Sequence, residues 1–193
     1  ATAAWVFGIE EEAVSSKQRR EAKTLNFGVL YGMGPQAFAR AAGISVEEAR
    51  AFIGRYQDQY RGLTNFIRET IDFAQEHGYV ETLFGRKRYV PELESSNPAV
   101  RAAAERAAFN FPLQGTAADI LKKAMIDLQA KIKSQFPKAR MVLTVHDELV
   151  CEVERGEVEA FSKAMKEVME GVMVLDVPLV VEVLVGTNWR DVR

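Results

Sequence analysis

The stretch RREAKTLNFGVLYGMG, residues 19–34, spaces four unusual side chains evenly: Arg19, Lys23, Phe27 and Tyr31. In an α-helix a step of four residues advances about 40° beyond a full turn, so the four side chains form one slowly drifting stripe. The other positions supply a mostly apolar face, made of Gln18, Ala22, Leu25, Val29 and Met33. The stretch therefore predicts a helix that packs through one face and presents two cations and two aromatic rings on another.

The chemistry of the stripe suits a nucleotide. Arginine offers a rigid fork of donors and lysine a mobile point charge, which together suit a polyphosphate, and a flat ring suits a base or a sugar. A helix with Arg and Lys four residues apart is more often only a solvated face, and aromatic side chains at that spacing more often belong to a core. Gly28 and Gly32 argue for function, because each costs about 1 kcal/mol in a helix interior and so indicates the close approach of another group.

Length and charge bound the possible functions. The 193 residues suffice for one ordinary domain or two small ones. The net charge of −2 gives no overall basic field, so nucleic acid would have to bind at local basic clusters, of which residues 17–23 and 86–88 are two. The single cysteine, Cys151, excludes an intramolecular disulfide and is expected to be a buried, inert thiol in a strand. The cysteine usage agrees with a reducing cytosol, so we expect a cytoplasmic protein, and no apolar run is long enough for a membrane span, so we expect no membrane partner.

The order of elements predicts an α+β fold, with a helical region followed by an antiparallel sheet packed by helices. Ser45 and Glu48 form a capping box, and Gly43 and Gly78 end helices. Pro112 predicts a kink between two helices. The helices are expected at 2–9, 16–33, 36–42, 45–56, 63–77, 99–111, 116–134 and 157–172. The strands are expected at 79–84 and 87–90, which form a hairpin with a basic tip, and at 140–145, 149–153 and 179–185.

Two further constellations carry chemistry. Arg106, Asn110 and Gln114 again step by four along a helical stretch, although Asn110 and Gln114 could instead satisfy backbone groups freed by Pro112. Asp147 and Glu148 lie at a turn between two apolar strands, where acidic residues are also common without any function. A hard cation that keeps several waters and bridges phosphates needs one or two carboxylates on such a turn.

The three motifs together resemble the family A DNA polymerases, the bacterial DNA polymerase I group. The motifs are Arg-x3-Lys-x3-Phe-x3-Tyr-Gly, ERAAFNFPLQG and Val-His-Asp-Glu, and they occur in the family's order. The resemblance implies that residues 1–84 are the fingers subdomain, with the nucleotide-binding helix at about 16–33. It implies that residues 85–193 are a palm subdomain lacking its N-terminal acidic motif.

The resemblance also implies a role for each candidate residue. Arg19 and Lys23 would hold the triphosphate of a dNTP, with Lys23 also donating a proton to pyrophosphate. Phe27 would pack on the incoming sugar and base, and Tyr31 would stack near the templating base. Asp147 would bind Mg²⁺ of a two-metal site directly, and Glu148 would orient water or the primer terminus. The implied contacts with primer-template DNA are Gly32, Arg86, Arg106, Asn110, Gln114 and His146.

One part of the family pattern has no counterpart in the sequence. The family's Asp-Tyr-Ser motif, which provides the other shared metal ligand, is not found, so the metal pair would be incomplete. We therefore expect a C-terminal fragment of an enzyme of DNA replication and repair, with little or no polymerisation on its own, whose partner is the N-terminal part of the same polymerase. Two alternatives are a non-catalytic nucleic-acid or nucleotide-binding module and one half of a split polymerase completed by another chain. In a bacterium the enzyme would be cytoplasmic and associated with the nucleoid; a phage or organellar polymerase of the family is also compatible with the sequence.

Overall fold

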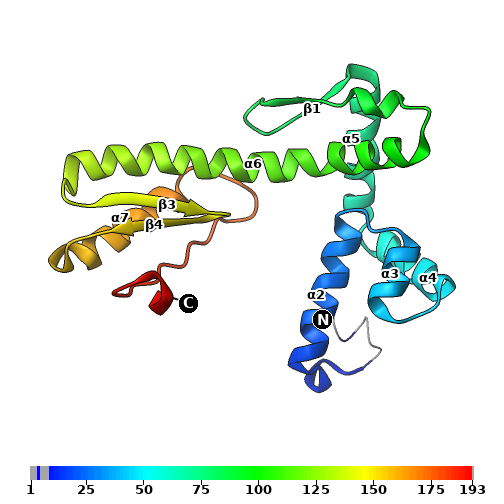
Figure 1. The fold of residues 1–193 in the computed structure, drawn as a ribbon, viewed down its shortest axis with the longest axis horizontal. Helices are drawn as coiled ribbons and strands as arrows, with labels where there is room; N and C mark the ends of the chain where they lie inside the picture. The colour runs from blue at the N-terminus through cyan, green and yellow to red at the C-terminus, as the bar shows by residue number, and fades with distance from the viewer. Residues whose placement is uncertain (1–3, 5–8, 193) are drawn as a thin grey trace. The chain divides into compact units, whose positions relative to one another are not determined.

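The first part of the chain is helical, as predicted. The computed structural model describes residue 4 and residues 9–192, so most of the helix expected at 2–9 lies outside the described residues. Figure 1 shows the succession of elements in this part. They are η1 (Glu11–Ala13), α2 (Ser16–Leu30), α3 (Pro35–Ala42), α4 (Val46–Gln59) and α5 (Arg61–His77).

The second part mixes short strands with one long helix. β1 pairs with β2, and β3 pairs antiparallel with β4. The elements are β1 (Tyr79–Glu81), β2 (Lys87–Tyr89), η2 (Pro91–Glu94), α6 (Pro98–Gln135), β3 (Arg140–Val145), β4 (Glu148–Glu152), η3 (Arg155–Glu157), α7 (Val158–Glu170) and η4 (Trp189–Val192). The predicted α+β class is confirmed. Among the described residues, no helix has the length and apolar character needed to cross a membrane.

Local capping chemistry sets several helix boundaries. The predicted capping box of α4 is present, because the Glu48 amide donates to Ser45 Oγ at 3.1 Å and the Ser45 amide donates to Glu48 Oε2 at 2.9 Å. A second box, between Ser15 and Gln18, begins α2 and was not predicted. Gly43 ends α3 in the left-handed conformation, with a φ of 69°.

The break between two helices that was predicted at Pro112 is wrong. Residues Pro98–Gln135 form one continuous α-helix with Pro112 inside it, so the two helices expected at 99–111 and 116–134 are one. A proline removes a single amide donor from the helix, and the flanking turns retain theirs. Packing on both sides of Pro112, at Ala108 and Thr116, holds those turns in place.

Two predicted strands differ from the structure. The first strand of the hairpin stops at Glu81 instead of residue 84, because the Thr82 hydroxyl accepts from the amides of Phe84 and Arg86 and so draws them out of the ladder. The strand predicted at 179–185 is not formed. A strand needs a partner for its backbone groups, and among the described residues the Val181 amide instead donates to Glu170 Oε1 at 2.9 Å.

The chain divides into two compact units. The first comprises residues 1–80 and 87–111, and the second comprises residues 81–86 and 112–193. The predicted subdomain boundary at residues 84/85 thus falls inside the hairpin tip that belongs to the second unit. The naming of the halves as fingers and palm stays a prediction.

Each unit has its own apolar core. In the first unit α2, α3 and α4 bury one cluster, in which the rings of Phe38 and Phe52 stack with centroids 4.8 Å apart. A second cluster in that unit joins Ala74 of α5 to Ala108 of α6. In the second unit Leu128 of α6 packs with β4 and α7. Burying a side chain of this size contributes about 1.5–3 kcal/mol, so a few such contacts hold each short element.

The sheet of the second unit is a hairpin with an irregular register. Met141 pairs with Cys151 and Leu143 with Val150, which leaves Val142 as an extra residue in β3. Such a bulge bends a strand and increases its twist. Cys151 lies in β4 and is partly rather than fully buried, packed against the core of this unit, and burial raises its pKa to about 11.

We therefore predict slow alkylation of Cys151. With a pKa of about 11, the thiolate fraction at pH 8 is about 0.1%, against about a quarter for an unperturbed cysteine. Iodoacetamide at pH 8 should modify the native chain at least about 100-fold more slowly than the urea-unfolded chain, and the native rate should rise about tenfold per pH unit up to pH 10. Equal rates for the native and unfolded chains would contradict the partly buried position of this thiol.

Candidate functional site

The predicted stripe on α2 is present on the surface of the first unit. The Lys23 Nζ atom lies 5.8 Å from the centroid of the Phe27 ring. The rings of Phe27 and Tyr31 are nearly parallel, with 12° between their planes and centroids 6.1 Å apart. Both rings are about 40% exposed, at 41% and 40%. The surface therefore offers one cation followed by two parallel faces that a planar group can contact.

The opposite face of α2 explains this exposure. Ala22 and Leu25 are 2% and 4% exposed, and Val29 and Met33 pack against the same apolar cluster. Gln18, predicted for this face, instead closes the capping box with Ser15. Burial of the apolar face fixes the rotation of the helix about its axis, so the stripe points outward.

The two ends of the stripe differ in how the structure supports them. Arg19 is exposed in the first turn of α2, where its amide donates to the Ser15 carbonyl at 2.9 Å. Tyr31 is the C-cap residue, beyond the last helical residue Leu30, and its amide still donates to the Phe27 carbonyl at 2.9 Å. The helix is thus slightly shorter than predicted, and all four stripe residues keep exposed side chains.

Both glycines of this region mark close approaches, as predicted. A Cβ at Gly28 would lie 2.6 Å from Met33 Cε, which is the far end of a flexible side chain. A Cβ at Gly32 would lie 2.8 Å from Cγ of Arg106 in α6. The end of α2 therefore lies directly against the helix that carries the second predicted constellation.

The second constellation lies along α6. Arg106 and Gln114 are exposed, and Asn110 is half-buried. Arg106 and Asn110 belong to the first unit and Gln114 to the second. Within the described residues, neither amide side chain hydrogen-bonds the backbone near Pro112, so the alternative of a purely local role for them has no contact to support it.

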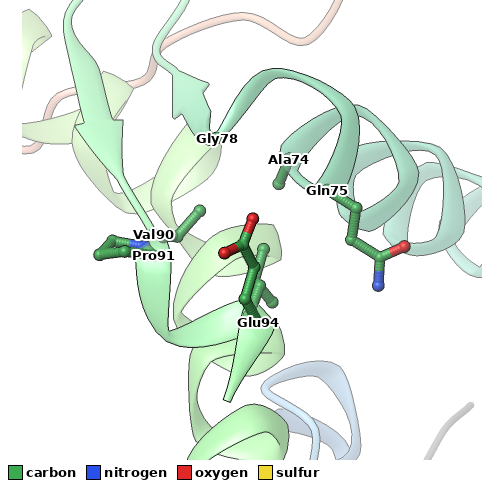
Figure 2. A pocket seen from close by; sticks show the side chains of 7 residues that line it. Ala74, Gln75, Gly78, Val90, Pro91 and Glu94 are labelled. Atoms are coloured by element: carbon green, nitrogen blue, oxygen red, sulfur yellow. The ribbon is translucent and has the colours of Figure 1, made fainter.

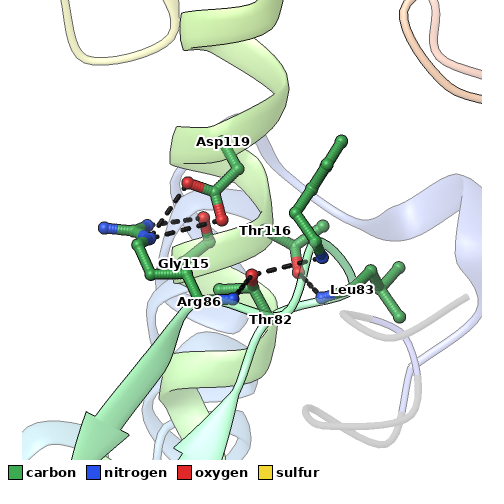
Figure 3. A network of polar contacts seen from close by, with 7 residues as sticks. Thr82, Leu83, Arg86, Gly115, Thr116 and Asp119 are labelled. Carbon is green, nitrogen blue, oxygen red and sulfur yellow. Dashed lines mark hydrogen bonds and ion pairs between the residues drawn. The ribbon is translucent and has the colours of Figure 1, made fainter.

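Arg86 at the hairpin tip is held by its own unit (Figure 3). Its Nε atom lies 3.0 Å from Asp119 Oδ1, and its Nη2 atom donates to the Gly115 carbonyl at 3.0 Å. Next to it, the buried Thr116 hydroxyl accepts from the Leu83 amide at 3.0 Å. These contacts give Arg86 a structural task, pinning the tip to α6, and its predicted contact with DNA stays a prediction.

The acidic turn of the second unit joins β3 to β4. His146, Asp147 and Glu148 are all exposed. His146 has a φ of 55°, a left-handed conformation that is uncommon for a residue other than glycine and clusters at functional sites. The sequence predicted the turn and its acidic residues, but the strained backbone of His146 carries no sequence signal.

The candidate donors for a metal ion are the carboxylates of Asp147 and Glu148. Among the described residues no three or more His, Cys, Asp or Glu side chains gather into a group that could hold a metal ion. Two neighbouring carboxylates on an exposed turn nevertheless fit the way Mg²⁺ is bound beside phosphates, with one or two carboxylates and the remaining ligands from water and substrate.

A small cavity of the first unit was missed by the sequence analysis. Figure 2 shows it between the end of α5 and the segment from Val90 to Glu94. Its volume is about 110 Å³, and its lining includes no predicted site residue. Because pockets for small organic ligands are typically about 300–1,000 Å³, this cavity is too small for a nucleotide.

Comparison with known proteins agrees with the motifs. A model of DNA polymerase family A matches residues 1–191. The thermostable DNA polymerase I of Thermus aquaticus is 51% identical over 192 residues, which cover 100% of this chain and 23% of that protein. The DNA polymerase I of Bacillus subtilis is 45% identical, with coverage of 100% and 22%. The chain thus spans less than a quarter of the length of these relatives.

A solved structure supports the fold as well. The POL domain of Pol1 from M. smegmatis, in complex with DNA primer-template and dNTP, matches with a TM-score of 0.92 and 41% sequence identity. The match covers 99% of this chain and 34% of that chain.

The ion pair of Arg86 with Asp119 predicts that replacing two aspartates of α6 will destabilise the chain to different extents. Asp119→Ala removes the partner of a half-exposed guanidinium and should lower the free energy of unfolding by about 1–2 kcal/mol. Asp127→Ala removes only an exposed pair with Lys123 four residues away, and should cost about 0.5 kcal/mol or less. Urea unfolding of both variants measures the difference. Equal losses in the free energy of unfolding would contradict a stabilising role of the contact between Arg86 and Asp119.

Proposed function

The chain belongs to DNA polymerase family A, and from this premise we propose that the protein of which it is part synthesises DNA on a template. The reaction is the transfer of a nucleotide from a dNTP to the 3′-hydroxyl of a primer. The observation that carries the proposal is the outward stripe of α2, in which a cation precedes two exposed, parallel rings. A triphosphate and a base arranged in the same order would meet matching groups along it.

The first unit binds the incoming nucleotide. Arg19 and Lys23 hold the triphosphate, and Lys23 also donates a proton to the departing pyrophosphate. Phe27 packs on the sugar and base, and Tyr31 stacks near the templating base. The exposure of these rings, fixed by burial of Ala22 and Leu25 on the other face, supports the assignment.

The second unit supplies the acidic groups of the reaction. Asp147 and Glu148 would hold Mg²⁺, Asp147 as the direct ligand and Glu148 orienting water or the primer terminus. When bound, the metal lowers the pKa of the attacking hydroxyl and stabilises the charge of the departing phosphates. His146 contacts the primer end from the strained position between the two strands.

The remaining candidates contact primer-template DNA. Arg106, Asn110 and Gln114 lie near the growing end of the primer, partly in the minor groove. That groove distinguishes base pairs poorly, which suits an enzyme that must accept any sequence. Gly32 and Arg86 complete the proposed DNA surface. Arg86 would keep its ion pair with Asp119 and contact DNA through the exposed part of its side chain.

A binding role without chemistry is the second candidate for the chain by itself. The observation that favours it is the pair of carboxylates with no third acidic partner among the described residues. In this account the chain alone binds primer-template DNA with strong salt dependence, and synthesis requires a preceding segment of the polymerase that supplies a further carboxylate.

A chimeric polymerase tests the proposal. The matching C-terminal part of the Thermus aquaticus relative is replaced by this chain, and extension of a labelled primer is measured with Mg²⁺ and four dNTPs. We expect extension by the chimera and a loss of at least about 100-fold in Asp147→Ala, because the direct metal ligand is removed. Asp127→Ala, which changes a half-exposed aspartate of α6 outside the proposed site, is the matched control and should extend normally.

Other results of the same assay separate the two candidates. Chelation of Mg²⁺ by EDTA should stop the chimera. The chain without its partner segment should bind the labelled DNA and leave the primer unextended. Extension that survives Asp147→Ala would overturn the assigned metal ligand, and extension by the chain alone would overturn the need for a further carboxylate.

The identity of residue 27 predicts how the chimera treats chain terminators. Phe27 should discriminate against nucleotides that lack the 3′-hydroxyl, as the family resemblance implies. In Phe27→Tyr the added hydroxyl can replace a polar contact that the terminator lacks, so acceptance of a dideoxynucleotide relative to its dNTP should rise about tenfold or more. Competition between the two nucleotides in single-base extension measures this ratio. An unchanged ratio would place the ring of residue 27 away from the sugar.

A further inference from the structure

The turn that ends α2 has an unusual combination of backbone and neighbours. The Gly32 amide donates to the Val29 carbonyl and the Met33 amide to the Gly28 carbonyl, at 3.0 and 2.7 Å. Gly32 has a φ of 81°, as the residue after the C-cap does in this kind of helix ending. This backbone alone accounts for a glycine, because other residues adopt such a φ at a cost.

The neighbours of Gly32 add a second restriction. A Cβ there would lie 2.8 Å from Cγ and 3.0 Å from Cδ of Arg106, and 3.1 Å from Cζ of Phe109. The Phe109 ring is only 6% exposed in the unit and has little room to move aside. The Arg106 atoms belong to the middle of the side chain rather than its tip, so an added methyl group must displace the whole arginine.

Gly43 provides an internal comparison. It ends α3 with a φ of 69°, and a Cβ there would have no neighbour within 4 Å. The two glycines therefore share the same backbone requirement, and only Gly32 also lies against another helix. The contact between Gly32 and Arg106 is a feature of its own and not a by-product of helix termination.

We propose that Gly32 is a positioning residue for Arg106: the bare backbone of the turn after α2 sets where the Arg106 guanidinium lies on primer-template DNA. The inference rests on the proposed function, in which Arg106 contacts that DNA. Arg106 forms no hydrogen bond or ion pair with the described residues, so the packing of its stem is what orients it.

The contact links two parts of the proposed site. Tyr31, which stacks near the templating base, directly precedes Gly32, so a shift of this turn reaches the Arg106 stem through a single van der Waals contact. Close-packed groups transmit such shifts because they have no free space to absorb them. Seating of a template base and the grip on the duplex behind it are therefore coupled within one unit.

The test compares four variants of the 193-residue chain: Gly32→Ala, Gly43→Ala, Arg106→Ala and the double variant Gly32→Ala/Arg106→Ala. The probe is a fluorescein-labelled hairpin primer-template with a short single-stranded overhang, and its affinity is measured by fluorescence anisotropy at one fixed salt concentration. Thermal melting followed by circular dichroism reports folding of each variant.

We expect Gly32→Ala to weaken binding about tenfold, close to the loss in Arg106→Ala, which removes the contact itself. Gly43→Ala, with the same backbone strain, should bind as the wild type does. In the Arg106→Ala background, Gly32→Ala should cause no further loss of affinity. A purely structural role of Gly32 would not produce this pattern, because its effect would persist without the arginine.

Three outcomes would overturn the inference. Gly32→Ala could bind like the wild type, or its effect could remain undiminished in the Arg106→Ala background. If Gly32→Ala fails to fold, the double variant must recover at least part of the lost stability, since it removes Cγ and Cδ of Arg106; no recovery would show that the Phe109 ring or the backbone strain, and not the arginine, limits this position. A fourth result has a different meaning. If Arg106→Ala binds DNA as tightly as the wild type, the DNA contact of Arg106 in the proposed function is refuted.

Discussion

The burial of one face of α2 is the constraint on which the candidate site depends. Leu25 is held among the side chains of α3 and α4, where the Phe38 and Phe52 rings stack. This packing permits only one rotation of α2 about its axis, and in that rotation Lys23, Phe27 and Tyr31 face outward. Most of the stability of a helix comes from packing of its apolar face, so the core of the first unit decides what the surface presents.

Elements that are defined by neighbouring residues could be predicted from the sequence. The capping box of Ser45 and Glu48, the helix end at Gly43 and the turn at Asp147 each depend on side chains a few residues apart. The stripe on α2 could be predicted for the same reason, since helical periodicity places its members on one face. These local rules also explain why the α+β class could be inferred without knowledge of the packing.

The failures concern interactions between distant residues. Pro112 does not end α6, because packing along the helix outweighs the loss of one amide donor. The apolar, valine-rich run of residues 179–185 indicates a strand, but strand formation requires a pairing partner, and β3 and β4 pair with each other. The contact of Gly32 with Arg106 joins two motifs far apart in the chain, so a sequence pattern could show only that the glycine is unusual. The ion pair of Arg86 with Asp119 was unpredictable for the same reason.

The unpaired segment after α7 bears on how the isolated chain behaves in solution. Val174, Val177 and Val180 are 97%, 75% and 81% exposed, and Leu184 and Val185 follow at 58% and 62%. An exposed run rich in β-branched side chains that belongs to no sheet can pair with another copy of itself. At high protein concentration this segment therefore favours edge-to-edge association, and a further charged residue beside Asp176 and Glu182 would act as a gatekeeper against it.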